Sequence, residues 1–367
     1  MSQSQQKRAR RALLGDRTIR ATVERLMGYE GLISEAMPEW WKFMEILRVR
    51  RSSMASELPG GWPEWCLMPI PALHSTLPSN GEPGGPMSEA RNELIARMLG
   101  FYAWRQGRTV WRFDPDVAAA LLETEDMGRV PAEVLRRLPL WGVYIQRPDG
   151  DWPGVDADGP CAGILARLTT QAIFDFDPTG APVLEIQYDL PGNGGIGIPL
   201  SMVPLIEDIS LNDALALVRR RVTEREAQLL HLGDPNSAAD DIEAERVRPW
   251  LALLMYLCSK GADTERRDPP PSGRHRGPRR EPGGTVTRVD VGFRIGAAIR
   301  KYRSTSSTEA STGKSVAPHL RRAHFHTYYS GAGSKSDPSK RCVEVKWLPP
   351  IAVGVGEVAP VVRPVDA

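Results

Sequence analysis

The pattern of apolar and polar positions divides the chain into helical, extended and irregular stretches. Apolar residues recur at helical spacing over residues 7–27, 40–50, 89–104 and 238–259, and shorter patterns predict helices near 116–123 and 131–137 and over 210–230. The run from Trp250 to Leu257 is so densely apolar that its helix should lie inside the core. Residues 1–57 are therefore predicted to form a helical N-terminal region.

Strand patterns gather in the middle of the chain. Short apolar or alternating runs occur at residues 109–113, 142–147, 163–168, 172–176, 183–189 and 195–200, with turn residues such as Pro148-Asp149-Gly150 between them. Such closely spaced runs predict an antiparallel meander. The glycine-rich stretch from Gly192 to Gly197 lacks the Lys-Ser/Thr of a phosphate-binding loop and opens no helix, so we interpret it as a turn or loop of the meander.

The C-terminal third begins with a stretch that has no periodicity. Residues 263–284 are rich in proline and arginine, which predicts an exposed, mobile linker. An amphipathic helix is predicted next, over residues 290–303, with Val291, Ile295 and Ile299 on its buried stripe. A polar loop then leads to two alternating runs, at residues 321–329 and 341–347.

These two runs predict a β-hairpin whose sides differ, because alternate residues of a strand share a face. The apolar sides consist of Ala323, Phe325, Thr327, Val343, Val345 and Trp347. The polar sides consist of Arg322, His324, His326, Tyr328, Cys342, Glu344 and Lys346. When the apolar sides pack against the body of the protein, the imidazole, guanidinium and phenol groups remain on a solvent-exposed surface. This surface is a candidate site.

The elements together predict an α+β fold with a helical N-terminal region, a central antiparallel sheet, and a C-terminal helix plus β-hairpin unit. The expected divisions are the helical region 1–57, a loop-rich α+β region 58–207, a helical pair 208–262, the linker 263–284, the helix–hairpin unit 285–353 and a tail 354–367.

Composition narrows the class of protein only slightly. The chain has 367 residues, of which 41% are hydrophobic and 25% charged, as in ordinary globular proteins. The four cysteines have no regular spacing, which indicates reduced thiols and no zinc knuckle. No apolar run approaches a membrane span, and no apolar segment follows the basic stretch 1–11, so we expect a cytoplasmic protein.

Charge is unevenly distributed along the chain. Residues 265–346 hold 18 Lys and Arg against 7 Asp and Glu, although the formal net charge of the whole chain is only +2. An acidic body with a basic C-terminal third could bind RNA, DNA or an acidic protein surface. A solvated charged face around a linker explains the same distribution.

The order of several C-terminal segments resembles one known family. The segments are Arg248-Pro249-Trp250-Leu251-Ala252-Leu253-Leu254-Met255-Tyr256-Leu257-Cys258-Ser259, then Val289-Asp290-Val291-Gly292-Phe293-Arg294-Ile295-Gly296, then Pro318-His319-Leu320-Arg321-Arg322-Ala323-His324-Phe325-His326, and finally Trp347-Leu348-Pro349-Pro350. They resemble the second type V-A anti-CRISPR family, which phages, plasmids and other mobile elements carry. Phe325 stands where the family usually has Trp, and Gly354 where it has Asn.

The resemblance implies a function. Members of this family are understood to recognise the N-terminal polypeptide of the type V effector nuclease during translation and to lower its mRNA. The implied partners are that polypeptide and the translating ribosome or the mRNA. The family pattern supplies no catalytic residues, so none is transferred to this chain.

Three interpretations of His324 and His326 remain open. They are structural, or they act as general acid and base of a ribonuclease-like site, or they belong to a face that binds RNA or an acidic segment without chemistry. Arg322 is the third candidate for a catalytic role. The residues expected to contact RNA or a partner are His319, Arg321, Arg322, His324, His326, Tyr328 and Lys346.

Cofactor and metal chemistry find little support in the sequence. Zinc would need ligands beyond the His-x-His pair, and the available candidates, His319 and Glu344, have no supporting spacing. We therefore expect no cofactor and no metal.

The alternative to anti-CRISPR action is a ribonuclease or RNA-binding protein of a mobile element that has no CRISPR target. Recognition of a nascent peptide needs a surface other than the hairpin, and the central sheet and the loop with Trp62 and Trp65 are the apolar candidates, unless those tryptophans are part of the core.

Overall fold

The computed structural model describes residues 3–56, 61–69, 89–124, 132–149, 161–170, 182–191, 200–206, 210–217, 238–267, 286–306, 319–331 and 342–353. The helices are α1 (Gln3–Ala36), α2 (Trp40–Val49), α3 (Arg51–Met54), α5 (Glu89–Gly107), α6 (Pro115–Leu122), α7 (Ala132–Leu135), α9 (Ala238–Cys258) and α10 (Phe293–Ser306). The strands are β1 (Thr109–Phe113), β2 (Gly142–Gln146), β3 (Gly163–Thr170), β4 (Pro182–Asp189), β5 (Leu200–Pro204), β6 (Thr264–Arg267), β7 (Thr287–Val291), β8 (His319–Arg321), β9 (His324–Ser330), β10 (Cys342–Leu348) and β11 (Ile351–Val353).

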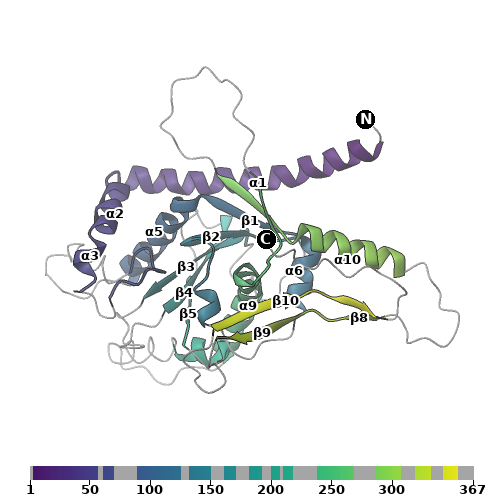
Figure 1. The fold of residues 1–367 in the computed structure, drawn as a ribbon. Coiled ribbons are helices and arrows are strands. Elements are labelled where there is room, and N and C mark those ends of the chain that lie inside the picture. The colour runs from purple at the N-terminus through teal and green to yellow at the C-terminus, as the bar shows by residue number, and fades with distance from the viewer. Residues whose placement is uncertain are drawn as a thin grey trace.

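A mixed seven-stranded sheet in the order β5-β4-β3-β2-β1-β7-β6 forms the centre of the molecule (Figure 1). Strands β2 to β5 make the predicted antiparallel meander. The α+β class is thereby confirmed. The sheet continues past the meander through parallel pairs, because β1 runs parallel to both β2 and β7. Strand β6 then pairs antiparallel with β7 and forms one edge.

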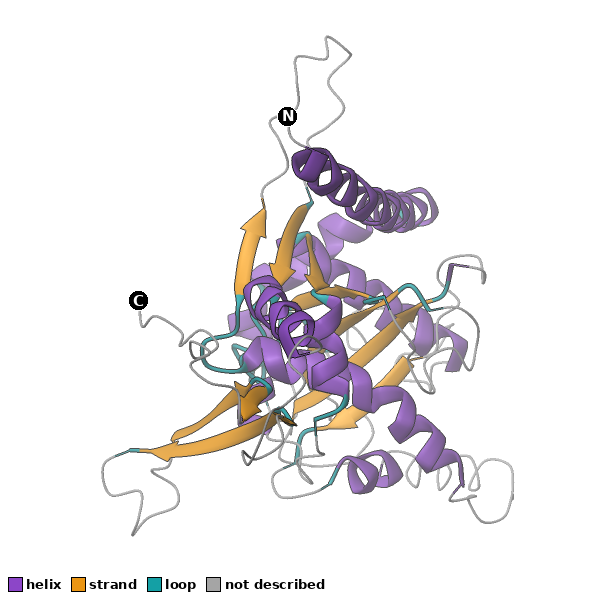
Figure 2. Ribbon diagram, turned by 90° about the vertical axis from the view of Figure 1, so that its right-hand side faces the viewer, coloured by secondary structure: helices purple, strands orange, loops and turns teal. Residues whose placement is uncertain are grey.

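Helices cover both faces of this sheet (Figure 2). On one face, apolar residues of α1, α2 and α5 pack on Val110, Tyr144 and Leu165. On the other face, α6, α7, α9 and the β9–β10 hairpin share a core with the opposite side chains of the same strands. The helix α1 and the hairpin thus lie on opposite sides of the sheet (Figure 1). Among the described residues, no helix is long and apolar enough to cross a bilayer.

The connection from β1 into α6 is set by Asp114. Its carboxylate accepts a hydrogen bond from the backbone N–H of Asp116 at 3.0 Å, and Pro115 occupies the first helical position. The same carboxylate receives two hydrogen bonds of 2.9 Å from Arg300 on α10. Gly296 makes this approach possible, because a Cβ there would lie 2.0 Å from Asp114 Oδ1. The glycine therefore lets α10 lie against the end of β1.

Two strands of the central sheet, β6 and β7, were not predicted from the sequence. Thr264–Arg267, expected to be linker, forms β6, and all four residues are exposed, so no apolar alternation marks the strand. Strand β7 begins at Thr287, before the predicted helix. Its last two residues, Asp290 and Val291, were expected to be the first residues of that helix. The helix starts only at Phe293, after Gly292 turns the chain with a φ of +73°.

Other boundaries also differ from the predictions. The last strand of the meander, expected at 195–200, starts at Leu200 and continues to Pro204. The predicted strand at 172–176 lies outside the described residues, as does most of the predicted helix at 210–230, of which 211–217 are helical. The rest of the predicted linker, 268–284, also lies outside them. Trp62 is a core residue with 6% exposure, and its indole donates to the carbonyl of Cys66, which confirms the structural interpretation of this tryptophan.

A buried ion pair joins the middle of the meander to the segment 61–69. Arg167 and Glu185 lie opposite each other on β3 and β4, and their charged atoms are 2.5 Å apart with side chains 3% and 0% exposed. Arg167 also donates to the carbonyl of Met68 at 3.3 Å. Burial raises the pKa of Glu185 even though Arg167 opposes that shift. The carboxylate therefore depends on this arginine to remain ionised inside the protein.

Replacing Arg167 by methionine should lower the free energy of unfolding by about 3–5 kcal/mol, because it leaves a buried carboxylate without its cation. The pKa of Glu185 would rise further in the folded state, so the native protein would bind the proton more tightly than the unfolded chain does. The stability that this proton contributes is present at low pH and is lost as the pH rises. Urea denaturation should therefore show a larger loss at about pH 8 than at about pH 5.

The double variant Arg167→Met/Glu185→Leu is the matched control. It removes both charges, so it should regain much of the stability and lose the pH dependence. A single variant with the same stability and pH profile as the double variant would contradict the importance of the ion pair.

Candidate functional site

The C-terminal hairpin has the two-sided construction that the alternation predicts. In its register Phe325 lies opposite Trp347, and His326 lies opposite Lys346. Trp347 is buried with its ring edge-on to that of Tyr256, at a centroid distance of 5.3 Å. Phe325 packs against the same core. The hairpin is therefore fixed to the body through its apolar side, and Phe325 fills the apolar position as expected.

The outward side of the hairpin carries aromatic and basic groups. The rings of His326 and Tyr328 are neighbours with a centroid distance of 4.5 Å, and both residues are exposed. Lys346 projects from the adjacent strand, and His324 is half-buried on the same face. The predicted grouping of these four side chains is confirmed, while their role stays a prediction.

The remaining residues of the predicted site lie elsewhere. Arg322 is exposed but sits in a break between β8 and β9, where Ala323 turns into the core. The prediction of one continuous strand over 321–329 is therefore wrong at this point. His319 and Arg321 belong to β8, which pairs with β11 and not with β10. Their side chains are outside the part of the chain that the structure describes.

A metal site is not formed by the described part of this region. Within that part of the chain, no three His, Cys, Asp or Glu side chains are grouped so that they could hold a metal ion. Glu344, one of the possible ligands, instead pairs with the ammonium group of Lys260 at 3.1 Å. The backbone N–H of Lys260 also donates to the carbonyl of Val345, so this contact ties β10 to the end of α9.

A second polar feature crosses the central sheet on the face that α1 covers. Positions that lie opposite one another in successive strand pairs from β6 to β4 are polar or glycine there. In order they are Glu265, Asp290, Arg112, Gln146, Gly163 and Asp189, and we call them the polar row. Three of them lie at the carboxyl ends of the parallel strands β7, β1 and β2, which is where sheets of this kind commonly bind ligands.

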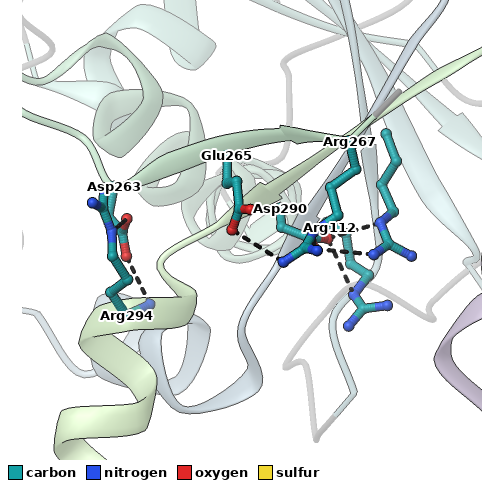
Figure 3. A network of polar contacts seen from close by, with 7 residues as sticks. Arg112, Asp263, Glu265, Arg267, Asp290 and Arg294 are labelled. Carbon is teal, nitrogen blue, oxygen red and sulfur yellow. Dashed lines mark hydrogen bonds and ion pairs between the residues drawn. The ribbon is translucent and has the colours of Figure 1, made fainter. Parts of the chain in front are cut away.

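Asp290 is the centre of the first half of the polar row (Figure 3). It is 3% exposed and is surrounded by guanidinium groups. The Nε atoms of Arg267, Arg288 and Arg112 lie 2.9, 3.1 and 3.8 Å from its carboxylate oxygens. Arg112 also stacks over the ring of Phe293 at 4.8 Å. One buried carboxylate thus gathers cations from three adjacent strands and faces the start of α10.

The start of α10 is fixed beside this cluster by Asp263. Its carboxylate accepts hydrogen bonds from the backbone N–H of Arg294 at 2.9 Å and of Ile295 at 3.3 Å. The Arg294 side chain closes back on the same carboxylate at 2.5 Å (Figure 3). A residue just before β6 therefore caps a helix that follows β7.

Asp189 ends the other half of the polar row and attaches α1 to the sheet. It accepts hydrogen bonds from Arg25 at 2.8 Å, Tyr29 at 3.1 Å and Tyr144 at 2.6 Å. Tyr144 reaches it across Gly163, where a Cβ would lie 2.6 Å from the phenol oxygen. Burial and the charge of Asp189 raise the pKa of Tyr144 well above its usual value, so this phenol stays a neutral donor.

An open cleft of about 350 Å³ adjoins this end of the polar row, between α1 and the ends of β2 and β3. Its lining includes Ala21, Arg25, Gln146, Arg147, Asp149 and Cys161. Gln146 is only 7% exposed, yet its carbonyl oxygen has no hydrogen-bond donor among the described residues. The cleft therefore combines guanidinium donors, a buried acceptor and small apolar surfaces.

The sequence indicated the hairpin but did not predict the polar row. The strand at 109–113 was predicted correctly, and an arginine inside it, Arg112, was the one available signal. Its neighbours in the row, Asp290 and Glu265, lie on β7 and β6, the two strands of the central sheet that were not predicted. The row depends on strand register, which a single sequence does not reveal.

Comparisons with known proteins agree with this architecture. A family model described as the anti-CRISPR type V subtype A2 family matches residues 111–355. Protein FinQ of Escherichia coli is 23% identical over 300 residues, which cover 73% of this chain and 80% of that protein. The crystal structure of AcrVA2 superposes with a TM-score of 0.50 at 17% identity and covers 89% of this chain and 98% of that one. This last likeness shows a shared fold.

Replacing Asp290 by alanine should lower the free energy of unfolding by about 3 kcal/mol, because it leaves partly buried guanidinium groups without their common carboxylate. Urea denaturation measures this. Glu265→Ala is the matched control, since Glu265 stands next in the polar row but is 59% exposed. Its loss should cost under about 1 kcal/mol. Equal losses for the two variants would show that Asp290 does not organise the cluster.

Proposed function

Because this chain belongs to the anti-CRISPR type V subtype A2 family, and so acts against type V CRISPR systems, we propose how it does so. It recognises the N-terminal polypeptide of the type V effector nuclease while the ribosome synthesises it, in the cytoplasm of the host cell. Recognition leads to loss of the effector's mRNA. The observation that carries the proposal is the family match over residues 111–355, which includes the polar row as well as the hairpin.

Two separate surfaces support an arrangement with two partners. The cleft beside Gln146 lies on the α1 side of the sheet, and the outward side of the hairpin lies beyond the opposite core. A nascent polypeptide and its mRNA emerge from different places on the ribosome, so a protein that responds to both benefits from two binding surfaces. In this proposal the polypeptide binds on the α1 side and RNA binds at the hairpin.

The hairpin has the chemistry that RNA binding requires. The exposed rings of His326 and Tyr328 offer faces for base stacking, and Lys346 beside them offers a cation for phosphate. Tyr329 is 63% exposed but lies opposite Val343, so its ring projects from the other side of the strand and is not part of this group. These groups need no cofactor to bind a single-stranded segment.

A ribonuclease is the second candidate, because two imidazoles and a lysine share the outward side of the hairpin. His324 and His326 would exchange protons with the ribose hydroxyl and the leaving oxygen, and Lys346 would stabilise the phosphate charge. Labelled RNA incubated with the purified protein separates the two candidates. Cleavage that His324→Ala or His326→Ala abolishes supports the enzyme, and intact RNA supports recruitment of a host nuclease.

Co-expression with a reporter tests the main proposal. The reporter mRNA encodes the effector's N-terminal polypeptide fused to a fluorescent protein. Both the reporter mRNA, measured by quantitative PCR, and the fluorescence should fall several-fold when this protein is present. The effect should need translation of the segment.

The control reporter has compensating frameshifts at the two ends of the effector segment. It has almost the same mRNA sequence but encodes an unrelated peptide. Its level should not change. Equal loss of both reporters would show that the protein responds to RNA and not to the nascent polypeptide.

Lys346→Glu tests the RNA surface directly. Reversal of one charge beside the stacked rings should weaken binding of a single-stranded RNA by about 3-fold to 10-fold at low salt. Lys42→Glu makes the same charge change at a lysine on α2 that is 75% exposed, and should leave the affinity almost unchanged. Filter binding at several salt concentrations measures both, and equal affinities for the two variants would argue against the hairpin.

A further inference from the structure

We propose that the cleft between α1 and the ends of β2 and β3 is the peptide site, and that it binds the main chain of an extended segment. This inference rests on the proposed function and names the place where the effector's N-terminal polypeptide binds. A main-chain N–H of the segment donates to the side-chain carbonyl oxygen of Gln146. A main-chain carbonyl or an acidic side chain of the segment accepts from the guanidinium of Arg147.

The first reason is the buried acceptor. Gln146 lines the cleft and is more than nine-tenths buried, and its side-chain carbonyl oxygen has no donor among the described residues. A buried acceptor without a donor costs on the order of 1–3 kcal/mol. Leucine of similar volume would avoid this cost, so a glutamine at this position suggests that a bound partner supplies the donor.

The second reason is the charge of the cleft. Its two arginines are accompanied by two aspartates, since Asp189 binds Arg25 and Asp149 lies on the rim beside Arg147. Such a balanced set does not attract a polyanion as a basic groove does. The main chain of a peptide, with its alternating N–H donors and carbonyl acceptors, matches this set better. A small side chain of the peptide fits as well, because Ala21 and Pro148 supply apolar lining. A peptide therefore fits the site better than RNA does.

The third reason is the rigidity of the walls. Arg25 is anchored on Asp189 and Tyr144, and the backbone N–H of Arg147 donates to the carbonyl of Ala162 at 3.0 Å. Both walls are thus held before a ligand arrives, which reduces the entropy lost on binding. The volume of about 350 Å³ is within the range of small ligand sites and accommodates a short stretch of a longer peptide.

The experiment measures the affinity of a fluorescent synthetic peptide, with the sequence of the effector's N-terminal segment, for the full chain by anisotropy. Gln146→Leu should weaken binding about 10-fold, as expected for the loss of one well-placed hydrogen bond. The same variant should melt at the same temperature as the original protein or higher, because it removes an unsatisfied buried acceptor. A purely structural glutamine would give the opposite pattern, lower stability with unchanged affinity.

Gln106→Leu is the matched control, because Gln106 is an exposed glutamine of α5 that does not line the cleft. Its affinity should equal that of the original protein. If the original protein binds the peptide and Gln146→Leu binds it equally well, the cleft is not the site, while the proposed function stands. If the original protein does not bind the peptide, the proposed recognition fails and the inference fails with it.

A crosslinking arm gives the location independently of affinity. Asp149→Cys places a thiol at the rim of the cleft, in a Cys342→Ser background because Cys342 is the exposed native cysteine among the described residues. A bromoacetyl derivative of the peptide should label this thiol, and unlabelled peptide should compete. In the control variant Glu123→Cys the thiol lies at another exposed position. Labelling of this thiol to the same extent would overturn the assignment. Competition by single-stranded RNA instead of peptide would also overturn it.

Discussion

Neutralisation of carboxylates inside the central sheet is the constraint on which the arrangement of the molecule depends. Asp189 and Asp290 are 4% and 3% exposed, and a charge so placed is costly unless cations and hydrogen-bond donors reach it. Asp189 takes its arginine from α1, which brings the longest helix onto the sheet. Asp290 takes its arginines from β1, β6 and β7, which holds the last two strands at the edge.

The same constraint explains why the site residues lie in one row. Paired strands place one residue from each strand at the same level, so a carboxylate on one strand is best met by side chains from its neighbours. Glycine at position 163 leaves room for the phenol of Tyr144 to reach Asp189. Gln146 stands between the two charged ends and lines the cleft. The structural ion pairs and the proposed binding site thus belong to one network.

Much of the fold follows from local patterns. The helices α1, α2, α5 and α9, the strand β1 and the meander were predictable because their apolar residues keep a regular period, and the hairpin was predictable because its two faces differ so clearly. The strands β6 and β7 were not. Four exposed residues, Thr264–Arg267, show no apolar alternation, and the helical pattern beginning at Asp290 concealed the end of β7. The polar row requires the parallel pairing of β1 with β7, which joins segments far apart in the chain and leaves no local signal.

The antiparallel pairing of β6 with β7 at the edge of the sheet has a practical consequence for protein engineering. Arg267 and Arg288 lie opposite each other on β6 and β7, so the arginine-rich stretch between these strands leaves the sheet and re-enters it at the same place. The sheet then sets no fixed length for that stretch, since closing a longer connection costs only a little additional entropy. A fluorescent or affinity module inserted there should therefore leave the fold intact.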